Sequence, residues 1–207
     1  MGAKGLRTKR KLIESTVRLL SETPLRDIKV FDIASAAETS AATFYVYFDN
    51  VIDVVLAAAS ELSQSTPEIL ALIDAPWTAT TSEAKAHAFV ETYVEFWAAH
   101  RSLLRTRNLA AEEGDMRFTE VRETAVRPLI QSLVRQIEDG KATGRVAAAV
   151  LPYAATGTLL MMLERLGALG HAYDNGGRVT QADLVQAAAH IVASVLGWRT
   201  GDGTVAS

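Results

Sequence analysis

Residues 32–48, which read DIASAAETSAATFYVYF, decide the fold of this chain. The first part of this stretch places apolar residues such as Ile33 and Ala37 on one side of a helix. The second part opens on Ser40, a residue type whose hydroxyl oxygen accepts a hydrogen bond from an orphan backbone N–H at a helix N-terminus. The stretch therefore predicts two short helices joined by a tight turn.

The second of these helices is unusually aromatic. Phe44 and Phe48 are four residues apart and share one face, so Tyr45 and Tyr47 cannot both point into the same core. We expect the phenylalanines to be buried, where they orient the helix. An exposed helix that carries aromatic rings and hydroxyls directly after a tight turn favours a helix-turn-helix that reads DNA.

The region from Thr8 to Leu56 resembles the TetR family of bacterial transcriptional regulators. The similarity is carried by TKRKLI at residues 8–13, DIA at 32–34 and SAATFYVYF at 40–48. Within the family, the chain is most similar to the ethionamide-regulator type and to other lipid- or drug-responsive repressors. The resemblance implies an all-α fold, with an N-terminal three-helix, homeodomain-like domain and a larger C-terminal helical domain that binds a ligand and dimerises.

We expect the helix-turn-helix domain to span residues 1–50 and the effector-binding and dimerisation domain to span 51–207. Pro24 should end the first helix, Pro128 should kink a long helix or force a local adjustment, and Gly140 and Gly144 should end that helix. A break is expected at His100. The predicted helices cover residues 8–21, 30–37, 40–48, 51–62, 67–73, 82–99, 102–113 and 115–139, followed by two more that carry apolar stripes over 159–170 and 184–198.

The composition is that of an ordinary soluble globular protein. The chain has 207 residues, of which 49% are apolar and 22% are charged, so it is long enough to bury a core. No apolar run reaches 18 residues, and no secretory signal is visible, so we expect no membrane contact and a cytoplasmic location. The absence of cysteine excludes disulfides, thiolate zinc sites and cysteine nucleophiles.

The net charge of −3 is less informative than its distribution. Basic residues are concentrated between Lys4 and Lys11, with no acid before Glu14. Such a run is, taken alone, equally consistent with a solvated, frayed terminus. Beside a helix-turn-helix, we predict that Lys9 and Arg10 contact phosphate groups of double-stranded operator DNA.

The predicted reading surface lies on the second short helix, because the major groove admits one helix and its N-terminal half reaches the base edges. The resemblance implies DNA contacts at the positions of Thr43, Tyr45 and Tyr47. The methyl group of Ala42 could meet a thymine methyl. The complete set of predicted DNA-contacting residues is Lys9, Arg10, Ser40, Ala42, Thr43, Tyr45 and Tyr47.

Three residues depart from the family pattern. Glu38 occupies the turn position where glycine is usual, so the turn must adopt a less common conformation or accept about 1 kcal/mol of strain. Val51 stands where many relatives have a phosphate-binding lysine, and Lys29 replaces the usual Thr or Ser cap. We therefore predict ordinary or weaker DNA affinity with a shallow dependence on salt.

The last two helices combine leucines with small residues such as Gly167 and Ala188, which lets helices approach closely. They could simply close the core of the subunit. We favour an additional role as the face of a homodimer, partly because proteins of the TetR family dimerise through their last two long helices.

Aromatic and methionine side chains in the second half could line an apolar cavity, although such a row is more often plain core. The resemblance implies that a small molecule binds in this domain and releases DNA, and we expect an apolar or acyl-type effector. The predicted effector-binding residues are Phe89, Tyr93, Phe96, Trp97, Asn108, Phe118, Met161, Met162 and Arg165.

An enzyme is the main alternative from another class. The four histidines show no metal-binding spacing, and the chain has neither a glycine-rich phosphate loop nor a nucleophile elbow. We therefore expect no enzymatic activity, no cofactor and no metal. A further alternative is an interaction protein that keeps the helix-turn-helix as a scaffold while its DNA binding is weak or lost.

Overall fold

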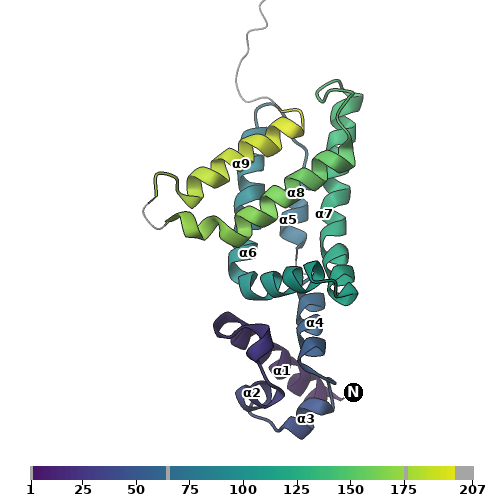
Figure 1. Ribbon diagram of the computed structural model, residues 1–207. Coiled ribbons are helices and arrows are strands. Elements are labelled where there is room, and N and C mark those ends of the chain that lie inside the picture. Colours follow the sequence, from purple (N-terminus) through teal and green to yellow (C-terminus); the bar gives the residue numbers. More distant parts are fainter. Residues whose placement is uncertain (1, 64–65, 175–176, 199–207) are drawn as a thin grey trace, which may run out of the picture. The chain divides into compact units, whose positions relative to one another are not determined.

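The computed structural model describes residues 2–63, 66–174 and 177–198, and within these ranges the chain is helical without any strand (Figure 1). The predicted all-α fold is confirmed. In chain order the elements are α1 (Ala3–Glu22), η1 (Leu25–Asp27), α2 (Val30–Ala36), α3 (Ala41–Tyr45), α4 (Val51–Leu62), α5 (Pro67–Asp74), α6 (Ser82–Glu112), α7 (Met116–Ala142), α8 (Pro152–Leu169), η2 (Gly170–Asp174) and α9 (Gln181–Val195).

The chain divides into two compact units. We call Met1–Ser65 with His100–Ala125 the head, and Thr66–Ala99 with Val126–Ser207 the body. Both long helices, α6 and α7, therefore pass from one unit to the other. Each unit is described separately below.

The head is a three-helix arrangement extended by α4. Helix α1 packs against α2 and α4, and α2 packs against α3. Phe118, from the first turn of α7, is completely buried in the same core. The head therefore includes the corner between α6 and α7, residues 100–125. Its fully buried side chains include Leu12, Ile33, Phe44, Val54 and Phe118.

Helix α1 begins at Ala3, earlier than the predicted start at Thr8. Lysine and arginine are good helix formers, so the basic run continues the helix instead of fraying. The helix ends at Glu22 because Thr23 is extended, with φ −132° and ψ 130°. This is the conformation that a following proline imposes, and the predicted stop at Pro24 is confirmed.

Helix α3 ends at Tyr45, before the predicted end at Phe48. The following helix, α4, is capped by Asn50, whose Oδ1 accepts a hydrogen bond from the backbone N–H of Asp53 at 3.0 Å. Because an N-cap residue has extended backbone geometry, the chain must leave the helical conformation before it reaches Asn50. Phe44 and Phe48 are nevertheless both buried, as expected.

The body is formed by α5, the first part of α6, the later part of α7, and α8 with α9. Helices α8 and α9 pack against each other. Helix α7 is fixed to α5 by two polar contacts: Gln136 Nε2 donates to the Ile73 carbonyl at 2.8 Å, and Arg135 Nη2 lies 2.9 Å from Asp74 Oδ1.

Of the irregularities expected in the long helices, the one at His100 is present. His100 has non-helical angles, φ −122° and ψ 18°, so the predicted break is a kink within α6. Pro128 lies inside α7, which remains helical around it. Gly140 does not end α7, because the helix continues to Ala142. An added Cβ at Gly140 would lie 2.6 Å from Val146 Cγ2, so this glycine instead permits a close approach.

By packing, α4 lies in the head, since Val54 and Val55 are fully buried there. The predicted boundary between a DNA-binding domain (1–50) and an effector-binding domain (51–207) is a functional division, and it stays a prediction. Asn175 and Gly176, in the turn expected between the last two helices, lie outside the described residues. None of the described helices is long and apolar enough to span a bilayer.

Candidate nucleic-acid interface and effector site

The N-terminus of α3 presents a group of small and hydroxyl-bearing residues. The Oγ of Ser40 accepts a hydrogen bond from the backbone N–H of Thr43 at 3.1 Å, and the two side-chain hydroxyls lie 3.0 Å apart. Ser40 and Ala42 are exposed, whereas Thr43 is half-buried. The predicted cap is therefore present, and it holds two hydroxyls at the start of the helix, where a DNA-reading helix contacts base edges.

The two tyrosines of the predicted reading surface differ in their exposure. Tyr45 is 57% exposed, and its ring packs edge-to-face on that of Phe44, with centroids 5.6 Å apart. Tyr47 is half-buried and packs against the core of the head. Tyr45 therefore offers most of its ring to a partner, while Tyr47 offers only part of its side chain.

The turn between α2 and α3 contains a residue in the left-handed backbone conformation that glycine usually adopts, but the residue is Glu38. Glu38 has φ +54°, the left-handed conformation. The backbone N–H of Glu38 donates to the Ser35 carbonyl at 3.0 Å, and that of Thr39 donates to the Ala34 carbonyl at 2.9 Å. These two bonds define a Schellman motif with Glu38 at the position that usually holds glycine. The turn therefore keeps the usual conformation, and Glu38 accepts the strain of a positive φ, instead of the turn changing to a less common conformation.

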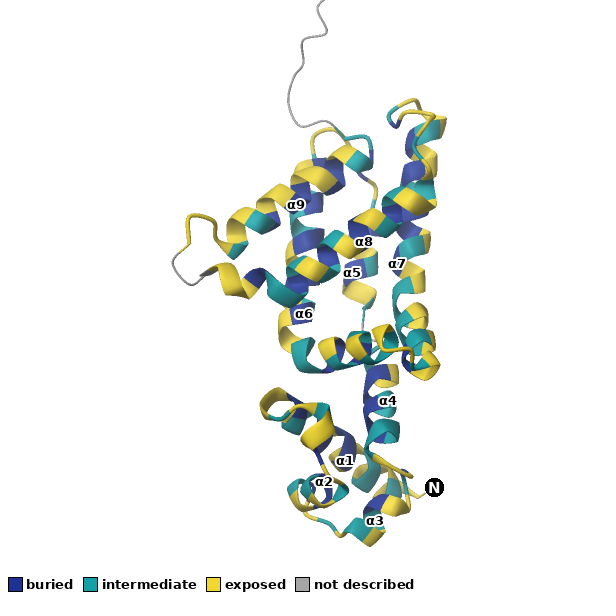
Figure 2. Cartoon of the chain, viewed as in Figure 1, coloured by how far each residue is buried: buried dark blue, intermediate teal, exposed yellow. Residues whose placement is uncertain are grey.

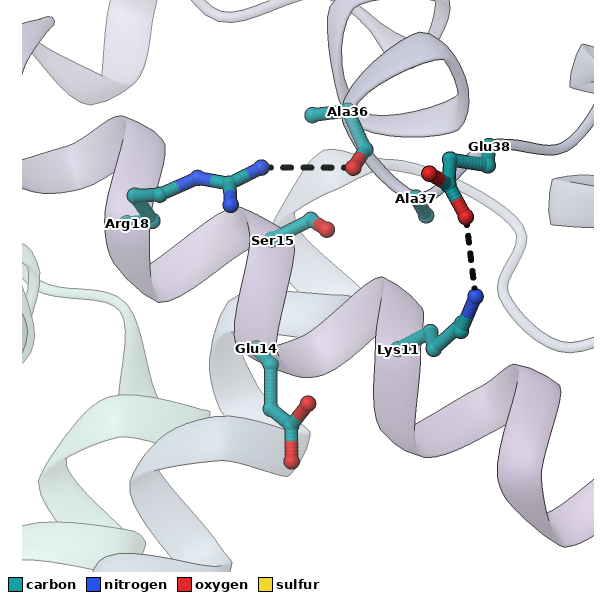
Figure 3. Close-up of a pocket in the computed structure, with 7 residues that line it drawn as sticks. All are labelled: Lys11, Glu14, Ser15, Arg18, Ala36, Ala37 and Glu38. Atoms are coloured by element: carbon teal, nitrogen blue, oxygen red, sulfur yellow. Dashed lines mark hydrogen bonds and ion pairs between the residues drawn. The ribbon is translucent and has the colours of Figure 1, made fainter.

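Side chains of α1 hold this turn in place (Figure 3). Lys11 Nζ lies 3.0 Å from Glu38 Oε2, and Arg18 Nη2 donates to the Ala36 carbonyl at 3.2 Å. Between these contacts lies a cavity of about 250 Å³. Its lining is largely charged and unlike an apolar effector site; it consists of Lys11, Glu14, Ser15, Arg18, Ala36, Ala37 and Glu38.

Both predicted phosphate-contacting residues of α1 already have neighbours within the head. Arg10 Nε lies 3.0 Å from Glu14 Oε1, and Lys9 Nζ lies 5.6 Å from the centre of the Phe48 ring. The Arg10 pair is highly exposed on both sides, so it contributes little stability and phosphate can replace it. Lys4 and Arg7 have no ion-pair partner in the described part of the chain.

The other departures from the family pattern also have structural explanations. The backbone N–H of Lys29 donates to Asp32 Oδ2 at 2.9 Å, and this forms only half of a capping box because an ammonium group cannot accept a hydrogen bond. Val51 is half-buried and packs against the core of the head. It therefore contributes to the packing of the head.

In the body, the structure gathers the aromatic row of α6. Phe89, Tyr93 and Trp97 are all buried, and the first two rings have centroids 6.3 Å apart. Trp97 packs directly on α8, since an added Cβ at Gly167 would lie 2.4 Å from Trp97 Cγ. Gly167 thus accommodates a ring of its own subunit. Phe96 is half-buried.

Of the remaining predicted effector residues, three lie on α8 and two lie in the head. Met161 is 66% exposed on α8, Arg165 is exposed, and Met162 is half-buried. Asn108 and Phe118 belong to the head. Asn108 Oδ1 accepts hydrogen bonds from the buried Arg107, from Nε at 3.0 Å and from Nη2 at 2.9 Å. Phe118 is fully buried in the core of the head.

Thr156 on α8 is a candidate site residue that the sequence does not single out. This side chain is completely buried, and its Oγ1 has no hydrogen-bond partner in the structure. Buried polar groups are nearly always paired, so the unpaired hydroxyl of Thr156 is an exception within the packed interior. A threonine among alanines on an apolar helix gives no sequence signal of this kind. Within the described ranges, no cluster of acidic and histidine side chains is placed to hold a metal ion.

The head has the architecture of a helix-turn-helix DNA-binding domain, and the comparisons identify its family. The profile described as "Bacterial regulatory proteins, tetR family" matches residues 12–62. The profile described as "Tetracyclin repressor-like, C-terminal domain" matches residues 70–200. The chain belongs to the TetR family, whose members are DNA-binding transcriptional regulators rather than enzymes. No curated protein sequence matches the chain.

Solved structures of transcriptional regulators share this fold. The fatty acid degradation regulator FadR from Bacillus halodurans has a TM-score of 0.70 and 18% identity, covering 93% of this chain and 95% of that one. FadR from Bacillus subtilis, solved in complex with stearoyl-CoA, has a TM-score of 0.70 and 16% identity, covering 89% and 97%. A putative regulator from Pseudomonas aeruginosa PAO1 has a TM-score of 0.71 and 19% identity, covering 91% and 89%.

Proposed function

We propose that this protein is a homodimeric, ligand-responsive repressor that leaves its operator when a small apolar effector binds. The proposal depends above all on one observation, the capped helix α3 with an exposed Tyr45 in the head of a TetR-family chain. As a DNA-binding regulator it would act in the cytoplasm. Each subunit would place α3 in a major groove, and the two heads would lie one or more helical turns apart on a near-palindromic site.

The proposed DNA contacts divide by chemistry. The hydroxyls of Ser40, Thr43, Tyr45 and Tyr47 can bond phosphate oxygens or base edges, and the methyl of exposed Ala42 can meet a thymine methyl. Lys9 and Arg10 supply positive charge. Because Arg10 is paired with Glu14 and Glu38 adds a negative charge beside the turn, the electrostatic part of the affinity should be modest.

The proposed dimer face is the outer side of α8 and α9. Figure 2 shows exposed residues along both helices. Among them are large apolar side chains, with Tyr153 69%, Met161 66% and Ile191 44% exposed. A group of exposed apolar side chains of this size marks an interaction site. A second copy of the same chain fits it best, because members of this family dimerise through these helices.

The proposed effector site lies in the body, beside the aromatic row of Phe89, Tyr93 and Trp97. Apolar lining with few polar groups suits an acyl-type molecule. The unpaired hydroxyl of Thr156 would supply a polar contact. The relative solved with stearoyl-CoA is consistent with this class of effector. Effector and DNA would bind with negative coupling, and the effect would be reciprocal.

Two observations favour the alternative, an interaction protein with weak or lost DNA binding. Glu38 forms an ion pair with Lys11, so the positive charge of Lys11 close to the turn is neutralised within the head. Val51 packs inward where a phosphate-binding lysine would otherwise stand.

The deciding experiment is a selection of duplexes from a randomised pool, followed by titration of the selected and a scrambled duplex over a range of salt concentrations. The proposal predicts selective binding, with a slope of log K against log[salt] shallower than about −5, which corresponds to about six phosphates per dimer. A steeper slope would contradict the electrostatic argument. If the protein enriches no sequence, the alternative is correct.

The dimer face has its own test. Ile191→Arg should convert the protein into monomers in sedimentation velocity, because a charge would be buried in an apolar interface. Gln186→Arg, on an exposed position of the same helix, is the matched control and should remain dimeric.

A further inference from the structure

The charged cavity between α1 and the end of α2 lies entirely within the head, and the function proposed above does not use it. Lys11, Ser15 and Arg18 line it from one face of α1, because residues three and four apart in a helix are neighbours. Its volume of about 250 Å³ is far larger than the share of about 30 Å³ that one water molecule takes in the liquid. The cavity therefore has room for a small organic molecule.

Ser15 is the central polar group of this cavity. The residue is only 6% exposed, and Figure 3 shows its hydroxyl directed into the space between α1 and α2. Among the described residues this hydroxyl has no hydrogen-bond partner. The neighbouring Thr16 hydroxyl, in contrast, donates to the Leu12 carbonyl at 2.8 Å, as buried hydroxyls in helices often do. Because buried polar groups are nearly always paired and Ser15 lines a cavity, a molecule in the cavity can supply the missing partner.

Arg18 brings a positive charge that no carboxylate neutralises in the part of the chain that the structure describes. Its Nη2 donates to the Ala36 carbonyl at 3.2 Å, which is a neutral acceptor. A guanidinium group has five N–H donors, so Arg18 keeps further donors for an additional acceptor. The side chain of Arg18 is exposed, so a molecule can reach it from solvent.

The other charged side chains that line the cavity are already paired. Glu14 Oε1 lies 3.0 Å from Arg10 Nε, and Glu38 Oε2 lies 3.0 Å from Lys11 Nζ. The charge that remains is the guanidinium of Arg18, and the hydrogen-bonding groups that remain are mainly donors. An excess of positive charge and of donors favours an anion over a cation.

We propose that this cavity binds a small molecule through an oxyanion, a carboxylate or a phosphate group, which Arg18 and Ser15 hold together. The planar fork of a guanidinium group matches the oxygens of both kinds of anion. Ser15 lies three residues earlier on the same face of α1, so its hydroxyl can donate to the same group. The small side chains of Ala36 and Ala37 leave room for the rest of the molecule. This ligand differs in chemistry from the apolar effector proposed for the body, and its site adjoins the turn that precedes α3.

The test is an NMR titration of the full-length, deuterated and ¹⁵N-labelled protein with potassium phosphate and, separately, with potassium acetate. Potassium chloride keeps the ionic strength constant, so that general salt effects cancel. We expect the backbone amide signals of residues 36–38 to shift and to saturate with at least one of the two salts. The salt that saturates them identifies the kind of oxyanion. Shifts that do not saturate with either salt would overturn the proposal.

Two variants remove the proposed contacts one at a time. Arg18→Gln should weaken binding by about tenfold or more, because a hydrogen bond to a charged group is lost. Ser15→Ala should weaken it by about threefold to tenfold, the effect of one neutral hydrogen bond. Arg26→Gln and Ser60→Ala are the matched controls, since both residues are exposed in the head and neither lines the cavity. Both controls should bind as the parent does.

Glu38→Gln should change the affinity in the opposite direction. It releases Lys11 and removes a negative charge beside the anion, so binding should tighten by about twofold to fivefold. Glu22→Gln removes the same charge from an exposed position of α1 outside the cavity, and it should leave the affinity unchanged. Equal affinities for Arg18→Gln and Arg26→Gln, or for Glu38→Gln and Glu22→Gln, would overturn the proposal. The titrations contain neither DNA nor effector, so their failure can be distinguished from a failure of the proposed repressor function.

Discussion

The head and the body use their aromatic residues in different ways. In the head, neighbouring residues of α3 divide sharply: Phe44 is completely buried, whereas Tyr45 is 57% exposed. In the body, Phe89, Tyr93 and Trp97 of α6 are all buried. The difference shows that the head leaves one ring of α3 open to solvent, while the aromatic row of the body is part of a packed interior.

The largest expected effect separates Phe44 from Tyr45. Phe44→Ala removes a fully buried ring and should lower the free energy of unfolding by about 3–5 kcal/mol. Tyr45→Ala should change it by less than about 1 kcal/mol, because the side chain is mostly exposed. Urea denaturation at one fixed protein concentration measures both. Similar losses for the two variants would remove the distinction between core and reading surface.

The next prediction tests whether the aromatic row is closely packed. Gly167→Ala places a methyl group against Trp97 and should cost about 1–3 kcal/mol of stability, as overpacking does. Gly157→Ala, on the same helix and with open space around the added Cβ, is the control and should not destabilise. A Gly167→Ala variant as stable as the parent would mean that the Trp97 ring has free space to move into.

A smaller effect is expected at the two turns of the head that share one hydrogen-bond pattern. Gly114, at φ +96°, stands in a Schellman motif like that of Glu38, at φ +54°. Glu38→Gly should stabilise the head by about 1 kcal/mol, because it relieves left-handed strain and loses only an exposed ion pair.

Gly114→Ala should have the opposite sign and a similar size, because nothing lies within 4 Å of the added Cβ and only strain remains. Thermal unfolding of the two variants checks the pair. Equal signs for the two substitutions would show that backbone conformation does not control the stability of these turns.

The smallest effect concerns pH. The pKa of Asp183 is lowered, chiefly by the backbone N–H of Thr180 and also by the Thr180 hydroxyl. Since the folded-state pKa lies below the unfolded value, this stabilisation is present above about pH 4 and is lost as the pH falls through the folded-state pKa. Asp183→Asn should therefore show a shallower loss of melting temperature on acidification. If the melting temperature of Asp183→Asn falls with pH as steeply as that of the parent, the capping contact between Asp183 and Thr180 does not contribute to stability.

The sequence contains most of the information for the head and less for the body. The cap at Ser40, the buried phenylalanines and the turn around Glu38 follow from local spacing, so they could be predicted. The early end of α3 depends on competition with the cap of α4 at Asn50, which spacing alone does not reveal.

Tertiary contacts explain what could not be predicted. Phe118 and Met161 have the same residue types as a cavity lining, but one fills the core of the head and the other lies on the surface. Small residues let helices approach, which favours a dimer face at Gly167, and only the packing shows that Trp97 takes that space. The unpaired hydroxyl of Thr156 is visible only once its surroundings are known.

The most direct test of the central claim is the affinity ratio between the selected duplex and a scrambled duplex, measured for Tyr45→Ala and for the control Tyr173→Ala, an exposed tyrosine of the body. If Tyr45 reads DNA, Tyr45→Ala lowers this ratio by about tenfold or more, the size of a lost base contact, while Tyr173→Ala leaves it unchanged. An unchanged ratio for Tyr45→Ala, with the variant still folded, would contradict the account.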